Sequence, residues 1–241
     1  MSDWFASWFD TKYYHLLYGD RNDVEAQAFI NNLIEVMNLS SDQYLLDLCC
    51  GKGRHSRYLN TSGFEVKGVD LSPSSIDFAK KFENERLTFD MHDMRDQMPG
   101  EKFDVVLNLF TSFGYFDNKE DNQKVFKSVY SYLNQGGIFL IDFLNVHKVI
   151  ANLNPHEIKR CGDIDFQIGK KVEDGFIVKT IDFVDDKSFH FEEKVAALDF
   201  EFFEISMRNE GFEIMDVYGS YELDRYDKFD SDRLIIKAIK K

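Results

Sequence analysis

Cysteine is scarce in this sequence, and the scarcity limits both covalent cross-linking and metal binding. The chain of 241 residues holds three cysteines, of which Cys49 and Cys50 are adjacent, and it has no Cys-x-x-Cys pair. Disulfide scaffolds and thiolate zinc sites need several suitably spaced thiols, so we expect neither, and no metal site. Reduced thiols are the usual state in a cytoplasm, which is the location we expect.

Positive charge is scarce as well. Lys and Arg total 29 against 43 Asp and Glu, which gives a formal net charge of −14. Proteins that bind nucleic acids through phosphates, or that dock on anionic membranes, need clustered cations, so we expect neither partner. We also expect no membrane span and no signal peptide, because the sequence lacks an apolar run of about 20 residues and lacks a basic, apolar start.

What the sequence does contain is a regular alternation of short apolar segments and helix signals between residues 44 and 143. The pair Ser72-Pro73 is typical of a helix start, and the pair Gly136-Gly137 is typical of a helix end. Five strands that alternate with helices indicate an α/β fold with a doubly wound parallel sheet. The predicted strands are residues 44–48, 64–69, 87–91, 103–109 and 138–143.

Two flanking regions follow other patterns. Trp4 with Trp8, and Phe5 with Phe9, stand at i,i+4 spacing and predict an N-terminal helical region. After Pro155, apolar and polar residues alternate between turn signals, which predicts an antiparallel β insert. A final helix and two strands are expected to return to the main sheet. The predicted parts are a helical cap or lid (1–40), a main domain (41–154 and 196–241) and the insert (155–195).

A glycine-rich segment lies where the first predicted strand passes into a helix. It runs from Asp47 to Arg54 and reads Asp-Leu-Cys-Cys-Gly-Lys-Gly-Arg. Glycines such as Gly51 and Gly53 let the backbone approach a ligand closely, and the helix N-terminus offers free N–H groups. A tight strand–helix turn without a ligand has the same composition, so this motif indicates a site only together with its neighbours.

Acidic residues also stand at the ends of the next two predicted strands. Asp70 ends the second strand, where a carboxylate can accept both ribose hydroxyls of an adenosine. Asp93 follows the third strand and can accept a hydrogen bond from the adenine amine, while the Met94 backbone can address a ring nitrogen. Because parallel strands share one carboxyl edge, Asp47, Asp70 and Asp93 together predict a nucleoside site.

Two nucleoside ligands compete for this site. A dinucleotide dehydrogenase requires a third glycine three residues after Gly53, so that a pyrophosphate can rest on the helix, but Ser56 stands there. Asp47 would repel a pyrophosphate and attract a cationic amino group. A ligand with adenosine at one end and an amino acid at the other is S-adenosylmethionine. An NAD(P)-dependent oxidoreductase and a non-catalytic S-adenosylmethionine-binding protein remain as alternatives.

At this point the sequence resembles the class I S-adenosylmethionine-dependent methyltransferases over about residues 44–241. In particular, it resembles the small-molecule enzymes that carry a β insert after the fifth strand. In this chain Cys49 stands where the first glycine of the family motif is commonest, and a small side chain suffices there. The motifs that carry the resemblance are residues 47–53, Gly68-Val69-Asp70-Leu71-Ser72, His92-Asp93-Met94-Arg95, residues 103–115, residues 133–139 and Gly211-Phe212.

The resemblance implies a Rossmann-like sheet of seven strands, mostly parallel, whose last strand is reversed. It also implies S-adenosylmethionine as the cofactor and S-adenosylhomocysteine as the product. Asn108 and Leu109 would close the pocket beside the sulfonium, and Leu71 would pack on the adenine. The residues expected to bind the cofactor are Asp47, Cys49, Gly51, Gly53, Asp70, Leu71, Asp93, Met94, Asn108 and Leu109.

Methyl transfer from a sulfonium is an in-line displacement, so the protein mainly has to align the nucleophile and exclude water. A base is needed only if the nucleophile arrives protonated. His147 follows the fifth strand and is the candidate general base, with a plain helix-start histidine as the alternative. Tyr14 is a second candidate, in a segment that forms either a lid over the cofactor or ordinary aromatic packing.

The sequence also bears on the acceptor and on the insert. Enzymes that methylate amino groups of DNA place Asp/Asn-Pro-Pro-Tyr/Phe after the fourth strand, whereas residues 108–111 read Asn-Leu-Phe-Thr. We therefore expect a small-molecule acceptor, and the negative net charge favours a cationic one or an amine. The insert is expected to cover the active site or to form a homodimer contact, and packing onto the sheet is the simpler alternative.

Overall fold

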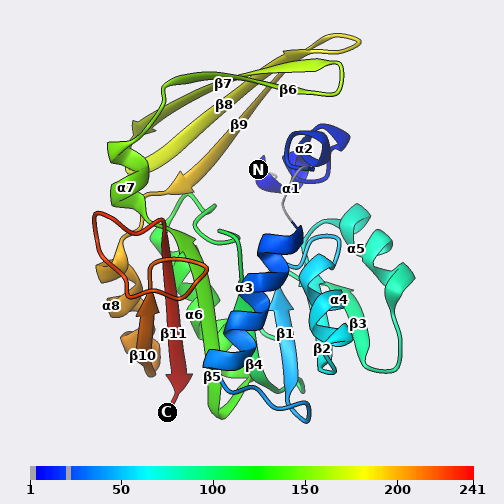
Figure 1. Ribbon diagram of the computed structural model, residues 1–241, viewed down its shortest axis with the longest axis vertical. Helices are drawn as coiled ribbons and strands as arrows, with labels where there is room; N and C mark the ends of the chain where they lie inside the picture. Colours follow the sequence, from blue (N-terminus) through cyan, green and yellow to red (C-terminus); the bar gives the residue numbers. More distant parts are fainter. Residues whose placement is uncertain (1–3, 20–22) are drawn as a thin grey trace.

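The computed structural model describes residues 4–19 and 23–241, which form two sheets with helices around them (Figure 1). The strands of the larger sheet are β1 (Tyr44–Leu48), β2 (Glu65–Asp70), β3 (Leu87–Met91), β4 (Phe103–Asn108), β5 (Leu133–Leu144), β10 (Phe212–Tyr218) and β11 (Arg233–Lys240). Their order is β10-β11-β5-β4-β1-β2-β3. Strands β1 to β5 are parallel, and β11 runs antiparallel to both of its neighbours. The predicted seven-stranded sheet with a reversed last strand is confirmed.

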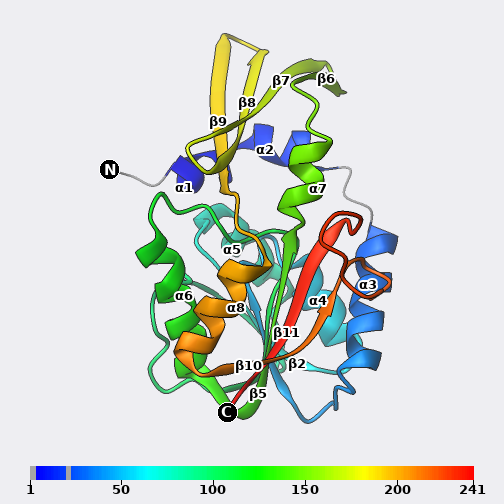
Figure 2. The same cartoon turned by 90° about the vertical axis from the view of Figure 1, so that its left-hand side faces the viewer.

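Helices cover both faces of this sheet (Figure 2). One face carries α3 (Asp23–Val36), α4 (Arg54–Thr61), α5 (Pro73–Ala79) and the short 3-10 helix η1 (Lys80–Phe82), and the other carries α6 (Lys119–Tyr132) and α8 (Phe200–Glu210). Phe29 and Leu59 are buried in the first layer, and Phe126 and Phe203 are buried in the second. Because both faces are covered, β1 and β4 are apolar almost throughout, as is typical of central parallel strands.

The second sheet is antiparallel and follows α7 (Val146–Ala151). Its strands are β6 (His156–Cys161), β7 (Ile164–Glu173), β8 (Phe176–Val184) and β9 (Ser188–Ala196), in that order. The sequence predicts the last three, whereas β6 is an addition. Most residues of β6 are polar, and its only large aliphatic side chain, Ile158, is 73% exposed, so no apolar alternation marks the strand.

Two short helices, α1 (Trp4–Trp8) and α2 (Lys12–Leu17), lie between the two sheets (Figures 1 and 2). The ring centroid of Trp8 is 4.3 Å from that of Phe191, and the centroid of Tyr13 is 4.6 Å from that of Phe183. These side chains belong to an apolar cluster that joins α1 and α2 to one face of the insert. The N-terminal helices are therefore held across the carboxyl edge of the main sheet.

Candidate functional site

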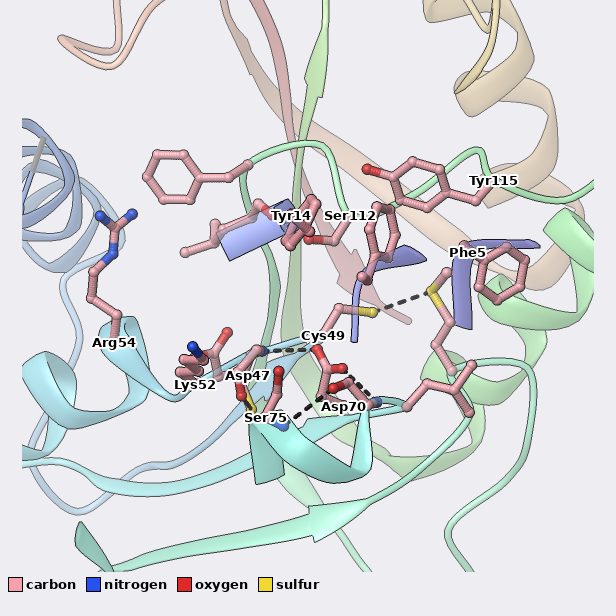
Figure 3. Close-up of a pocket in the computed structure, with 18 of the residues that line it drawn as sticks. Phe5, Tyr14, Asp47, Cys49, Lys52, Arg54, Asp70, Ser75, Ser112 and Tyr115 are labelled. Carbon is pink, nitrogen blue, oxygen red and sulfur yellow. Dashed lines mark hydrogen bonds between the residues drawn. The ribbon is translucent and has the colours of Figure 1, made fainter. Parts of the chain in front are cut away.

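A cavity of about 410 Å³ lies at the carboxyl edge of the seven-stranded sheet, under α1 and α2 (Figure 3). Its walls come from the loops after β1, β2, β3 and β4 and from the N-terminal helices. This volume falls within the range of small-molecule sites, which are about 300–1,000 Å³. The ends of four strands thus meet around one cavity.

The turn after β1 brings bare backbone to this cavity. Cys49, Gly51 and Gly53 have φ angles of 68°, 56° and 76°, in the left-handed region that favours glycine. A Cβ atom added to Gly53 would lie 2.6 Å from the ring of Phe89, so packing also requires glycine there. A Cβ atom added to Gly51 would meet nothing within 4 Å, which leaves open space for a ligand against the backbone.

Asp47 is a buried carboxylate in the wall of the cavity. It is 2% exposed, and the Ser56 hydroxyl donates a hydrogen bond to its Oδ2 at 2.5 Å. Burial raises the pKa of Asp47 to about 6, although the hydrogen bonds from Ser56 oppose this rise. A cationic group in the cavity would favour the ionised form of Asp47. The residue is therefore suited to hold an ammonium group.

Asp70 is fixed by backbone groups on both sides. Its Oδ2 accepts from the Gly51 N–H at 2.8 Å, and its Oδ1 accepts from the Ser72 N–H at 2.9 Å (Figure 3). Burial raises the pKa of Asp70, while these backbone hydrogen bonds oppose the rise. Each oxygen keeps a further lone pair. An oriented carboxylate of this kind can accept two neighbouring hydroxyl groups of a ligand in the cavity.

The loop after β3 supplies Asp93 and Met94, which also line the cavity. Arg95 donates to Asp93 from Nη2 at 2.6 Å and from Nε at 3.0 Å. Burial raises the pKa of Asp93, but the hydrogen bonds from Arg95 outweigh it and lower the pKa below its usual value. Cys49 Sγ lies 3.6 Å from Met94 Sδ, so the loops after β1 and β3 touch (Figure 3).

The structure brings most of the predicted cofactor residues together. Those that line the cavity are Asp47, Cys49, Gly51, Asp70, Leu71, Asp93, Met94 and Leu109. Gly53 and Asn108 are not among the lining residues. Gly53 is the N-cap of α4, and the buried Asn108 side chain donates to the Leu48 carbonyl at 3.1 Å. These two residues support the turn after β1.

The two predicted catalytic residues lie in different places. Tyr14 on α2 lines the cavity, with its ring centroid 4.8 Å from that of Phe9. His147 is the second residue of α7, where its Nε2 is 3.9 Å from Asp199 Oδ2 and its ring is 5.9 Å from that of Phe229. It is not among the residues that line the cavity. The structure therefore places Tyr14 in the wall of the cavity and His147 outside it.

Several lining residues were not singled out by the sequence analysis. Arg54 and His55 open α4, and the His55 ring stacks on Phe110 with centroids 4.5 Å apart and planes 14° apart. Their position directly after the glycine turn was a usable signal. Phe5 and Tyr115 close the other side, and their rings are 6.4 Å apart. Their meeting depends on packing between distant segments, which no local pattern encodes.

Polar contacts fasten α1 and α2 at both ends of the cavity. Asp10, between the two helices, accepts from the Ser72 hydroxyl at 2.6 Å and from the Ser74 hydroxyl. Glu193 of β9 accepts from Trp8 Nε1 at 2.6 Å and from the Tyr18 hydroxyl at 2.7 Å. No described residue of β6 to β9 lines the cavity itself. The insert touches the walls of the site through the N-terminal helices and through the Ala196 N–H, which donates to the Gly114 carbonyl in the loop after β4 at 2.7 Å.

Two further features of the described chain bear on its chemistry. In residues 4–19 and 23–241, no three His, Cys, Asp or Glu side chains are grouped so that they could hold a metal ion. No helix within the same residues is both long enough and apolar enough to cross a membrane.

Comparison with known proteins places these features in a family context. Residues 45–137 match the model of the methyltransferase domain. A glycine/sarcosine N-methyltransferase from Aphanothece halophytica is 28% identical over 229 residues, which cover 91% of this chain and 83% of that protein. A solved S-adenosylmethionine-dependent methyltransferase from Clostridium acetobutylicum shares the fold with a TM-score of 0.80 and 24% identity, covering 95% of this chain and 96% of that one.

Another solved structure with the same fold has S-adenosylmethionine bound. It is an amino pentose methyltransferase from Micromonospora echinaspora, with a TM-score of 0.72 and 17% identity. The match covers 96% of this chain and 98% of that one. At this identity the likeness shows a common fold. This is the fold that brings the strand ends described above to one edge.

Proposed function

The chain belongs to the class I S-adenosylmethionine-dependent methyltransferases, and from this premise we propose that it methylates a small-molecule amine in the cavity under α1 and α2. The observation that carries the proposal is the fixed carboxylate of Asp70, which lies between two backbone N–H groups at an enclosed strand edge. The alternatives of an oxidoreductase and of a non-catalytic binding protein have no support in the comparisons.

The residues around the cavity fit this cofactor. Asp70 would accept the ribose hydroxyls, and Asp47 would face the ammonium group of the methionine moiety. Asp93 and the Met94 backbone would bind the adenine, with Leu71 against its ring. When bound, the cofactor supplies a methyl group on a sulfonium that is already activated for transfer. The protein then has to orient the acceptor and exclude water.

The acceptor side of the cavity is formed by the loop after β4 and by the N-terminal helices. Phe110, Ser112 and Tyr115 lie on the loop, Phe9 directly follows α1, and Tyr14 lies on α2. A cavity of about 410 Å³ suits a small acceptor better than a polymer. An amine that arrives neutral has its own lone pair, so no general base is needed, and the Tyr14 hydroxyl can orient it.

Relatives with related activities support an amine acceptor. Besides the glycine/sarcosine N-methyltransferase, a dTDP-3-amino-3,4,6-trideoxy-α-D-glucopyranose N,N-dimethyltransferase from Streptomyces venezuelae is 32% identical over 101 residues. That match covers 41% of this chain and 41% of that protein. Both names describe methylation of nitrogen in a small molecule. We therefore infer a nitrogen acceptor, and the particular amine has to be found by assay.

The test combines binding with turnover. Calorimetry with S-adenosylhomocysteine should show saturable binding in the micromolar range, whereas NADH should show none. Labelled S-adenosylmethionine should then pass its methyl group to glycine, to sarcosine or to a 3-amino sugar nucleotide. Folded protein that binds no S-adenosylhomocysteine would refute the proposal. Binding without transfer to any amine of a broad panel would refute the amine acceptor and favour a non-catalytic role.

A further inference from the structure

The loop after β4 has a backbone conformation that its residue types disfavour. Phe110 and Thr111 have φ angles of 56° and 58°, so two consecutive side chains are held in the left-handed region. For a β-branched residue such as threonine this is a genuine outlier. Among the residues that the structure describes, no other adjacent pair without a glycine has this conformation. Strain of this kind persists only where the surroundings impose it.

A single buried residue of β5 binds the backbone of both strained residues. Asp142 is completely buried. Its Oδ2 accepts from the Phe110 N–H at 2.7 Å, and its own backbone carbonyl accepts from the Thr111 N–H at 3.0 Å. The loop is thereby fastened to β5 through the backbone N–H groups of Phe110 and Thr111.

Arg233, the first residue of β11, completes the connection. Its Nε and Nη2 both lie 2.7 Å from Asp142 Oδ1, and its Nη2 also donates to the Thr111 hydroxyl at 2.8 Å. The side chain is 17% exposed and its guanidinium lies 5.4 Å from the centre of the Tyr221 ring. One guanidinium thus bridges the buried carboxylate and the side chain of a strained residue, a geometry that suits the fork of arginine.

The ion pair of Asp142 and Arg233 supports the wall of the cavity but does not itself line the cavity. Neither Asp142 nor Arg233 is among the residues that line the cavity, whereas Phe110 and Ser112 of the loop are. A buried ion pair is by itself a weak source of stability, because both charges lose their hydration. This ion pair also makes directed hydrogen bonds to the strained loop, which indicates that it fixes the conformation of the loop.

We propose that Asp142 and Arg233 are positioning residues, which hold Phe110 and Thr111 in the left-handed conformation and so fix the wall that orients the methyl acceptor. The part of this inference that concerns the acceptor rests on the proposed function. The part that concerns the loop does not, because the contacts exist without any ligand. The two parts therefore need separate measurements.

Hydrogen exchange of backbone amides tests the loop directly. Arg233→Lys keeps a cation beside Asp142 but cannot bridge to Thr111 in the same way, and Arg233→Met removes the cation. Both variants should raise the exchange rates of the Phe110 and Thr111 amides at least tenfold, with Arg233→Met showing the larger rise. The matched control is Lys237→Met on the same strand, because Lys237 is also 17% exposed and pairs with Asp216 at 3.1 Å.

Two results would overturn the positioning of the loop. One is unchanged exchange at residues 110–111 in a folded Arg233→Lys protein. The other is an equal rise there and in the amides of β1, which would mean general destabilisation. Thr111→Val, which removes only the side-chain acceptor, should give a smaller rise and so separates that contact from the ion pair.

Kinetics test the acceptor part on whichever amine the wild type methylates. Arg233→Lys should raise the KM for that amine about tenfold, while the Kd for S-adenosylhomocysteine stays within twofold, because Asp70 and Gly51 are untouched. Equal weakening of both ligands would overturn the acceptor role. If the wild type methylates no amine, the proposed function and the acceptor role fail together, and the exchange rates still decide whether the pair holds the loop.

Discussion

The floor of the cavity and the segment that we propose as its lid are held by different kinds of contact. In the floor, backbone N–H groups of Gly51 and Ser72 fix the Asp70 carboxylate. In the lid, which consists of α1 and α2, side chains make the polar contacts, with Asp10 on one side and Glu193 on the other. The backbone donors of the floor belong to the turns directly after β1 and β2, whereas each side-chain contact of the lid can be removed by one substitution. We infer that the floor is preformed and that the lid is the part that releases for ligand exchange.

The largest effect is expected from Gly53→Ala, a change in the floor that alters no polar side chain. Gly53→Ala would put a Cβ atom in the left-handed region, 2.6 Å from the Phe89 ring. Strain and overpacking together should lower the free energy of unfolding by roughly 2–4 kcal/mol. Denaturant unfolding measures this. Gly100→Ala is the control, since its φ is 87° but a Cβ atom there meets nothing within 4 Å, so a loss equal to that of Gly53→Ala would contradict the packing argument.

Loss of the fixed carboxylate should come next. Asp70→Ala removes the acceptor for the ribose hydroxyls and should weaken binding of S-adenosylhomocysteine by roughly 1.5–3 kcal/mol, as expected for charged hydrogen bonds. Calorimetry measures the loss, and Asp165→Ala in the insert serves as the control, because that carboxylate is exposed and pairs with Arg160. Unchanged affinity in the Asp70 variant would show that the ligand does not use this floor.

Binding should also depend on pH through Asp47. Because its pKa is raised to about 6, it is protonated below that pH in the free protein, and a cationic ligand must displace the proton. The Kd for S-adenosylhomocysteine should therefore rise about tenfold between pH 7 and pH 5. Asp47→Asn should abolish this dependence. An identical pH profile in that variant would rule out Asp47 as the titrating group.

The same raised pKa predicts the sign of a stability effect. The folded protein without ligand binds the proton of Asp47 more tightly than the unfolded chain, whose carboxyl has the ordinary pKa of 3.8. The contribution of this group therefore favours folding at low pH and declines as pH rises from about 4 to 6. The difference between wild type and Asp47→Asn in urea unfolding across this window measures it. A difference that grows in favour of the wild type with rising pH would contradict the burial argument.

The smallest effect is expected in the lid. Asp10→Ala removes the contacts to Ser72 and Ser74 at an exposed site. It should speed release of S-adenosylhomocysteine by about two- to fivefold, corresponding to a lost hydrogen bond of about 0.5–1 kcal/mol, with little change in Tm. The two tryptophans of the chain, Trp4 and Trp8, both lie in α1, so their fluorescence reports the lid in stopped flow. Release as slow as in the wild type would mean that this contact does not control opening.

The floor could be predicted from the sequence, because its residues stand at or shortly after the ends of neighbouring parallel strands. Asp47 and Asp70 stand at the ends of β1 and β2, and parallel pairing of these strands brings their ends to one edge. The reversed β11 was implied by family resemblance. The salt bridge from Arg95 to Asp93 was missed, because its geometry depends on a loop conformation.

The contacts of the lid and of the acceptor wall could be predicted from the sequence much less well. Phe9 and Tyr115 meet with ring centroids 5.2 Å apart, although more than 100 residues separate them in the sequence. The pair Phe110 and Thr111 has left-handed φ angles but contains no glycine, so the residue types did not indicate this conformation. His147 was predicted near the acceptor because it follows β5, and in the structure it lies on α7 beside Asp199, outside the lining of the cavity. Contacts between distant elements decided each of these cases.

A crystal structure with S-adenosylhomocysteine tests the central claim most directly. We predict that the nucleoside lies in the cavity under α1, with its ribose hydroxyls on Asp70, its adenine beside Met94 and its amino group toward Asp47. A ligand bound elsewhere on the protein, or a nucleoside in the cavity that leaves Asp70 without a contact, would contradict the account.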